Sequence, residues 1–347
     1  MRVSHSPPRT AAAALAVAGL LLVAFDGSAA TGPRILQKST PGEIEALALD
    51  GSRLAYDVSA EYSPKRCNTV YVWNVTRQTT TRVSGRQTCG ADNTSTGAGV
   101  RELALAGSRV AWIVNQGGNS ESGDYLYTTL VAHPGERVLA SAYRTGDVSG
   151  VLTGNWLGGL VGADRFLAVN HWATDSHGEV TTAGLERVAA RMSDLSQGVA
   201  TMTARATDGR QLAVLRSDGT VGIYSTGAQL RRTVVPSAAK EVALRGDYLV
   251  VLTKASTLEV YNSHSGRRLR MWRAAGAAQL DISSGLAAYS AGRTVRVVRL
   301  TTGKSVFTAH ASAAVSAVQL EPSGLAYAFR GRGNSGRIVF VPMRRLR

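Results

Sequence analysis

Residues 47–56 read LALDGSRLAY, and nearly the same string returns 56 positions later as LALAGSRVAW over residues 103–112. In both strings leucines alternate with other residues up to a central Gly-Ser pair, and a second apolar run follows. Alternation with a period of two is typical of a β-strand with one buried face, and glycine at the interruption marks a tight turn. Each string therefore predicts two antiparallel strands joined by a turn.

The same unit recurs along the chain in seven copies. Counted from Leu49, the steps between copies are 56, 56, 45, 38, 38 and 38 residues, and most copies are followed by two further strand patterns around a glycine-bearing turn. Four short antiparallel strands in about 40 residues make one blade of a β-propeller. We therefore predict an all-β fold, a single seven-bladed β-propeller of four-stranded antiparallel blades. The blades are expected at about residues 44–84, 101–142, 156–195, 199–236, 240–273, 278–310 and 316–343.

Two places in this scheme are irregular. Residues 185–189, in the third copy, fit either a strand or a short helical turn. The seventh copy ends after three strand patterns, whereas an additional one at residues 34–37 precedes the first copy. An open edge strand is exposed to pairing with other chains, and an N-terminal strand added to the last blade covers that edge. We therefore expect residues 34–37 to close the propeller domain, which spans residues 31–347.

Some strand patterns match a known repeat. Residues 70–74 read VYVWN and residues 295–304 read VRVVRLTTGK, and both resemble the third strand and following turn of a WD40 repeat. Over residues 34–346 the chain resembles the seven-bladed propellers of the WD40, YVTN and TolB-like type. No copy holds a Gly-His pair or a Trp-Asp pair, so the resemblance is one of pattern. It implies a rigid ring that presents binding loops.

The first 30 residues have the features of a signal peptide. Arg2 and Arg9 form a basic start, residues 11–25 are apolar, and residues 28–30 are small. These features predict secretion and cleavage before Thr31. The alternative is an uncleaved segment that anchors the protein to the membrane. The predicted location is therefore secreted or extracytoplasmic.

The chain has two cysteines, Cys67 and Cys89. In an oxidising compartment a pair of cysteines usually forms a disulfide, so we predict that these two are bonded. Their number excludes a C-x-x-C redox motif and a zinc site built from cysteines alone.

Most of the residues beyond the minimal 38-residue step fall in the first three copies. We expect them to form loops after the second strand of each blade and between blades one and two, all on one face of the propeller. Long loops on a rigid scaffold often carry recognition. The candidate ligand-binding residues are Glu61, Tyr62, Asn115, Gln116, Asn119, Glu121, Asp124, His171, Trp172, Asp175 and His177.

The formal net charge of +15 is unevenly distributed. Residues 31–200 carry 15 basic and 16 acidic residues (net −1), whereas residues 201–347 carry 22 and 7 (net +15). The third and fourth strands of a blade lie toward the outside of a propeller, so this charge predicts a belt on the perimeter that could bind an anionic envelope polymer. Its residues are Arg231, Arg232, Arg267, Arg268, Arg270, Arg273 and Arg299.

The sequence lacks a specific catalytic or cofactor motif. Residues 331–336 read GRGNSG, but a strand pattern rather than a helix follows, which excludes the dinucleotide-binding motif. His171, Asp175 and His177 match no common zinc spacing. We therefore predict neither a cofactor nor a metal ion.

The predicted function is that of a secreted, non-enzymatic, monomeric scaffold that binds a protein or a glycan at the cell envelope. One alternative is a propeller enzyme of hydrolase, lyase or quinoprotein-like type, with its site at the mouth of the central channel. A second alternative is an extracellular binder of polyanions or nucleic acid. Specific nucleic-acid recognition is not expected, because aromatic residues are not interleaved with the arginines.

Overall fold

The computed structural model describes residues 34–59, 68–85, 98–117, 121–146, 152–198, 202–333 and 335–346. The chain divides into a unit of residues Met1–Gly32 and a unit of residues Pro33–Arg347, and all described residues belong to the second unit. The predicted signal peptide therefore lies outside the described residues. Within the described part, no helix has the length and the apolar character that a membrane crossing requires.

The described residues form 28 β-strands and one short 3-10 helix, η1 (Met343–Arg345), so the predicted all-β class is confirmed. The first strands are β1 (Leu36–Thr40), β2 (Leu47–Asp50), β3 (Arg53–Val58), β4 (Thr69–Asn74) and β5 (Thr79–Arg82). The next are β6 (Ala98–Ala106), β7 (Arg109–Gly117), β8 (Glu121–Leu130), β9 (His133–Gly146), β10 (Leu152–Ala163), β11 (Phe166–Thr174), β12 (Val180–Val188) and β13 (Met192–Gly198).

The second half of the chain continues with shorter strands. They are β14 (Met202–Thr207), β15 (Gln211–Arg216), β16 (Val221–Ser225), β17 (Leu230–Val234), β18 (Ala239–Arg245), β19 (Tyr248–Thr253), β20 (Thr257–Asn262) and β21 (Arg268–Arg273). The last are β22 (Ala277–Ser283), β23 (Leu286–Ala291), β24 (Thr294–Arg299), β25 (Ser305–His310), β26 (Val315–Glu321), β27 (Gly324–Arg330) and β28 (Gly336–Pro342).

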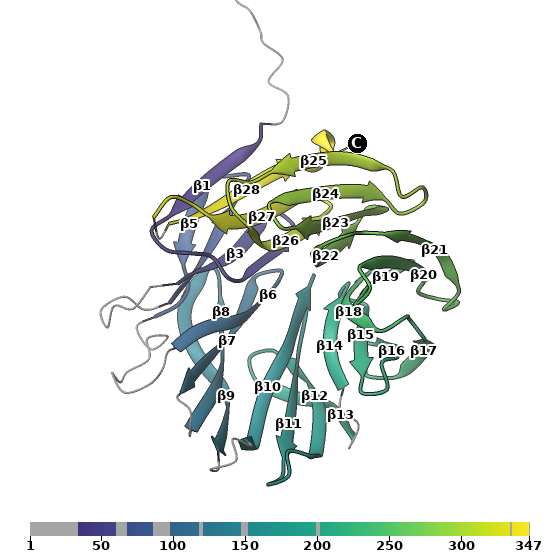
Figure 1. The fold of residues 1–347 in the computed structure, drawn as a ribbon. Coiled ribbons are helices and arrows are strands. Elements are labelled where there is room, and N and C mark those ends of the chain that lie inside the picture. The colour runs from purple at the N-terminus through teal and green to yellow at the C-terminus, as the bar shows by residue number, and fades with distance from the viewer. Residues whose placement is uncertain are drawn as a thin grey trace, which may run out of the picture. The chain divides into compact units, whose positions relative to one another are not determined.

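Hydrogen bonding joins these strands into five four-stranded sheets and one eight-stranded sheet. Four of the smaller sheets use consecutive strands, and the fifth has the order β1-β28-β27-β26, with Leu36 opposite Phe340. Figure 1 shows β1, in purple, beside β28, in yellow. The N-terminal strand of the described chain thus lies at the edge of the C-terminal sheet.

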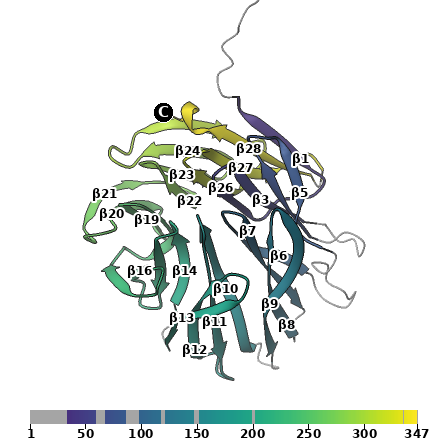
Figure 2. The ribbon, with the colours of Figure 1, turned by 180° about the vertical axis from the view of Figure 1, so that it is seen from behind.

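The eight-stranded sheet differs from the expectation of separate four-stranded blades. Strand β9 pairs with β10 through Gly146 and Leu152, Thr145 and Thr153, and Arg144 and Gly154, which fuses the second and third groups of four (Figure 2). The strands from β6 to β13 have 7 to 14 residues, whereas all other strands have 4 to 7. The described extra residues of the second and third copies therefore lengthen strands, whereas most of those in the first copy lie outside the described residues.

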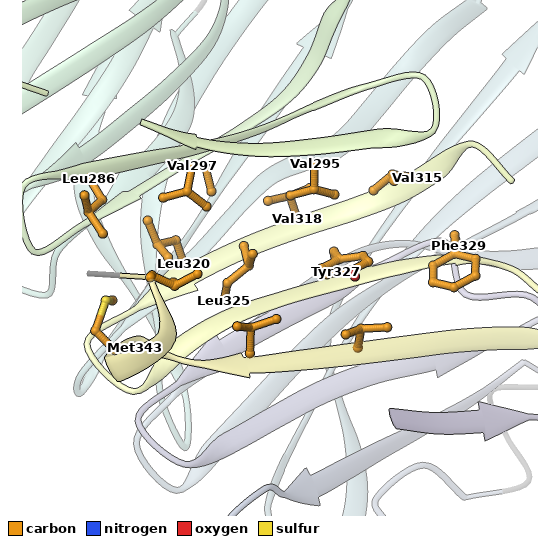
Figure 3. Packing of buried hydrophobic residues seen from close by; sticks show 14 residues of the cluster. Leu286, Val295, Val297, Val315, Val318, Leu320, Leu325, Tyr327, Phe329 and Met343 are labelled. Carbon is orange, nitrogen blue, oxygen red and sulfur yellow. The ribbon is translucent and has the colours of Figure 1, made fainter. Parts of the chain in front are cut away.

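The apolar core lies between successive groups of four strands. Figure 3 shows one cluster, in which Val295 and Val297 of β24 face Val318 and Leu320 of β26. Six comparable clusters join the other neighbouring groups, including β2–β4 with β26–β28. The first strands of the groups, β2, β6, β10, β14, β18, β22 and β26, contact one another in that order, and β26 also contacts β2.

Polar side chains on these first strands bind the backbone of the next group. Glu102 Oε2 accepts a hydrogen bond from the N–H of Leu160 (2.6 Å), and Asp281 Oδ2 accepts one from Leu320 (2.6 Å). Asp208, in the turn after β14, accepts one from the N–H of Gly246 through Oδ2 (3.0 Å). Hydrogen bonds to charged acceptors are stronger than neutral ones, so these carboxylates hold neighbouring groups in register.

Candidate binding site at the extended end of the fused sheet

The strands of the eight-stranded sheet have two distinct ends. At the turn end lie the short connections β6–β7 and β10–β11, which contain Gly107 and Asp164. At the extended end, β7 ends at Gly117 and β8 begins at Glu121, β9 ends at Gly146 and β10 begins at Leu152, and residues 175–179 connect β11 to β12. The residues predicted from the sequence to bind a ligand, where described, fall near the extended end.

The prediction that these residues belong to loops is wrong for most of them. Asn115 and Gln116 lie in β7, Glu121 and Asp124 in β8, and His171 and Trp172 in β11. Only Asp175 and His177 lie in a connection, the tight turn between β11 and β12. Residues 185–188 are part of strand β12, which settles the choice between strand and helical turn. Glu61, Tyr62, Asn119, Cys67 and Cys89 lie outside the described residues.

Asp124 is the buried centre of this end. Its side chain is 0% exposed and pairs with Arg144 (Nη1–Oδ2 2.7 Å), which is itself only 5% exposed, and with Arg101 (Nη1–Oδ1 3.4 Å). It also accepts hydrogen bonds from Asn115 Nδ2 (2.8 Å) and from the N–H of Leu157 (3.3 Å). A buried carboxylate requires such partners. Asp124 therefore positions its neighbours and does not face a ligand.

Two tryptophans lie beside Arg144 and stack on each other. Its guanidinium lies 3.9 Å from the ring centre of Trp156, and the rings of Trp156 and Trp172 stack at 5.9 Å with an angle of 3° between their planes. The two rings face each other because Trp156 and Trp172 are partners across β10 and β11. Both are half-buried. The stack is thus a preformed feature of the sheet.

Tyr143 is the neighbour of Arg144 on β9, so its side chain points to the opposite face of the sheet. It is 57% exposed and meets Tyr125 edge to face, with ring centres 5.6 Å apart. Arg144 and Trp156 were not predicted from the sequence. Trp156 has the alternating pattern of a core residue, and only the pairing of β9 with β10 brings it to Arg144.

A glycine permits that pairing. Gly154 has φ +138°, and a Cβ atom there would overlap the carbonyl oxygen of Tyr143 and lie 2.8 Å from Cα of Arg144. Residues with side chains rarely adopt this conformation. Gly154 therefore lets β9 approach β10 closely enough to fuse the sheets.

His171, Asp175 and His177 have separate roles. His171 Nδ1 lies 2.7 Å from Glu186 Oε1, and its ring lies over Gly184. Burial raises the pKa of Glu186. Asp175 Oδ1 accepts hydrogen bonds from the N–H groups of His177 (2.9 Å) and Glu179 (3.0 Å), which lower the pKa of Asp175 and close the turn. The described residues contain no group of three or more histidine, cysteine, aspartate or glutamate side chains able to hold a metal ion.

The first strands of the groups enclose a cavity of about 150 Å³. Arg245 and Glu321, which line it, form a two-fold contact (Nη1–Oε1 2.9 Å and Nη2–Oε2 2.7 Å). Burial raises the pKa of Glu321 to about 8 and that of Asp281, in the same lining, to about 6. Sites for organic ligands usually have about 300–1,000 Å³, so this cavity is smaller than a typical site for an organic ligand.

The seven arginines of the predicted perimeter belt are all exposed. Five of them lie on β17 and β21, the last strands of their sheets. Among the described residues one of the seven forms an ion pair, Arg268 with Glu259 (3.6 Å). Binding of an anionic polymer by this set stays a prediction.

The sheets and their contacts define a WD40-like β-propeller fold. A chain of the crystal structure of the mitotic checkpoint complex matches with a TM-score of 0.57 and 17% identity, over 96% of this chain and 99% of that chain. The WD40 β-propeller domain of Doa1 matches with a TM-score of 0.53 and 14% identity, over 89% and 96%. No protein-family model and no curated protein matches the chain. At these identities the likeness concerns the fold alone.

Proposed function

We propose that this chain is a seven-bladed propeller closed by β1, and that it acts as a secreted, non-enzymatic scaffold whose protein partner docks at the extended end of the fused sheet. Seven groups of strands with a core cluster between each neighbouring pair support the ring. The pairing of Leu36 with Phe340 supports closure by β1.

The observation that supports the binding site is the row of side chains formed by Arg144, Trp156 and Trp172. Tryptophan, tyrosine and arginine dominate the binding energy of protein interfaces. Here the stacking and the buried Asp124 fix them before a partner arrives. Groups that are already ordered lose little conformational entropy on binding, so this end of the sheet is suited to recognition.

The geometry favours a protein over a glycan. A sugar ring binds by stacking on a free aromatic face, whereas the Trp156 ring is already engaged by Arg144 and by Trp172. The edges of the two indole rings suit packing of apolar and polar side chains. One chain with this fold belongs to the mitotic checkpoint complex. This analogy of fold supports a scaffold role here in general terms.

The proposed location depends on the N-terminal segment. Secretion follows if residues 1–30 act as a signal peptide, and an anchored form follows if the segment is retained. The N-terminal sequence of the protein isolated from its host tests this directly. A first residue at or near Thr31 supports secretion, and an intact start in the membrane fraction supports the anchor.

A photo-cross-linking residue at Trp172 tests the docking site. We expect it to capture a partner that the same residue at Leu269, on β21, does not capture. The affinity of the identified partner for Trp172→Ala and Trp156→Ala should then fall at least about tenfold, which corresponds to 1.4 kcal/mol. Unchanged affinity in both variants overturns the site, and capture of glycans on an array without a protein partner overturns the choice of partner.

A second candidate function, binding of an anionic polymer, is favoured by the exposure of all seven belt arginines. Screening by salt weakens such contacts, so association with isolated envelope should fall steeply between about 50 and 200 mM salt. Arg270→Glu with Arg273→Glu should abolish it. Association that is independent of salt contradicts this role.

A further inference from the structure

A pocket of about 510 Å³ opens at the turn end of the fused sheet. Four arginines line it, namely Arg53, Arg109, Arg165 and Arg187. The other lining residues are small, apolar or serine, and no aspartate or glutamate is among them. Arg109 and Trp172 lie near opposite ends of their strands, so this pocket is separate from the proposed docking site.

The turn at Gly107 brings arginines from different strands together. Arg53, the first residue of β3, donates a hydrogen bond from Nη1 to the carbonyl oxygen of Gly107 (2.8 Å). The side chain of Arg165, from the β10–β11 turn, passes the same glycine, since a Cβ there would lie 3.9 Å from Arg165 Cγ. Arg109 begins the strand that follows Gly107. Three groups of four strands thus contribute to one pocket.

The charge of these arginines is not balanced by ion pairs. None of the four forms an ion pair within the described residues. Arg109 donates to the neutral Thr128 Oγ1 (3.3 Å), and Arg187 lies 6.0 Å from the ring centre of Phe166. Asp50 accepts a hydrogen bond from the N–H of Gly107 and interacts with Arg245 across the channel.

The chemistry of the pocket points to an anionic ligand with an apolar part. Guanidinium groups bind the oxygens of phosphate and carboxylate through paired hydrogen bonds. Several arginines around one space repel each other, and a group with two negative charges relieves that repulsion better than a single carboxylate. Leu130, 36% exposed, and Leu167 supply an apolar wall. The volume lies within the range of sites for small organic ligands.

We propose that this pocket binds a small organic phosphate ester. Its dianionic phosphate lies among the four guanidinium groups, and its apolar group lies against Leu130. This inference concerns the turn end of the fused sheet and stands apart from the proposed protein scaffold, because it uses none of the same side chains.

Calorimetric titration with phenyl phosphate tests the proposal, with phenol and inorganic phosphate as comparison ligands. We expect saturable binding of phenyl phosphate, weaker binding of inorganic phosphate and no binding of phenol. Arg165→Ala with Arg187→Ala should weaken binding at least about tenfold. These two side chains are exposed and donate none of the hydrogen bonds described here, so the variant should keep the wild-type melting temperature.

A control variant separates the site from general charge. Arg293→Ala with Arg296→Ala removes two exposed charges that belong to neither proposed site and should leave phenyl phosphate binding unchanged. Vesicles of phosphatidylcholine with phosphatidic acid distinguish a lipid headgroup from a free ester: vesicle binding that is lost in the Arg165/Arg187 variant supports the same phosphate chemistry from a lipid source. Absence of saturable phosphate binding in both arms, or equal loss in the Arg293/Arg296 control, overturns the proposal.

Discussion

The fused sheet from β6 to β13 and the four smaller sheets from β14 to β28 are built from the same repeat but use their residues differently. The smaller sheets follow the 38-residue step with strands of 5 to 7 residues, and β1 completes the last of them. The fused sheet has up to 14 residues in one strand and joins two groups through β9 and β10.

The difference shows that insertions in a repeat can extend secondary structure instead of forming loops. Backbone groups at the end of a strand remain satisfied if the neighbouring strand extends equally. Here β7, β8, β9, β10 and β11 all extend, so each has a partner. Both candidate sites lie on this longer sheet, one at each end.

The largest expected effect concerns the C-terminal sheet. A mature chain that starts at Pro41 lacks β1, so the edge of β28 loses its partner and the apolar contact of Leu36 is lost. We expect loss of cooperative unfolding or a drop of more than about 4 kcal/mol in the free energy of unfolding, measured by urea denaturation. A chain that starts at Leu36 is the matched control. Equal stability of the two chains would contradict closure by β1.

The next prediction compares two buried acids, one from each region. Asp124→Ala leaves the buried Arg144 without its carboxylate and should cost about 3–5 kcal/mol of unfolding free energy. Glu259→Ala in the smaller sheets leaves Arg268, which is 51% exposed and can be solvated, so its cost should be about 1–2 kcal/mol. Urea denaturation measures both. Equal costs would show that the fused sheet has no special dependence on its buried pair.

A glycine pair tests the fusion itself. Gly154→Ala places a Cβ against Tyr143 and Arg144 at positive φ, and we expect a loss of about 2–3 kcal/mol because β9 and β10 must separate. Gly219→Ala also has positive φ (+81°) but faces open space, so it should cost about 1 kcal/mol. If thermal unfolding shows the same loss of stability for both variants, the close approach of β9 and β10 at Gly154 does not contribute to stability.

The smallest expected effect is a dependence of stability on pH that originates outside the fused sheet. Burial raises the pKa of Asp57, in β3, to about 7, that of Asp281, in β22, to about 6 and that of Glu321, in β26, to about 8. A carboxyl whose pKa is higher in the folded than in the unfolded state favours folding while protonated, so stability should fall as the pH rises from about 4 to 8.

Asp57→Asn should flatten this dependence, because the amide oxygen can still accept the N–H groups of Glu45 and Ala46 without carrying a charge. The lowered pKa values of Asp175, Asp218 and Glu259 act below this pH range and have the opposite sign. Unfolding free energies measured at pH 5, 6, 7 and 8 check the prediction. A stability that increases over this range in the wild-type protein contradicts it.

The sequence by itself determined the repeat, the all-β class and the position of most strands. Local alternation and turn glycines suffice for this, as in residues 47–56, where LALD becomes β2 and RLAY begins β3 around a turn at Gly51. In the copies spaced by 38 residues, the observed strands match the alternation in the sequence closely. Each of these strands pairs with a strand of similar length, and these copies contain no inserted residues.

Only the tertiary structure decided the two candidate sites. Whether Asn115 or Trp172 lies in a loop or a strand depends on whether neighbouring strands extend alongside, which no local pattern reports. The sequence did not predict the arginine pocket, because its arginines belong to residues 31–200, where basic and acidic residues nearly balance and the net charge is −1. Arg53 and Arg109 occupy the same place in the quoted repeat, yet Arg165 and Arg187 join them only through the turn at Gly107 and the pairing of β10 to β12. The sequence shows which charged residues are present, whereas the pairing of distant strands decides which of them lie in the same pocket.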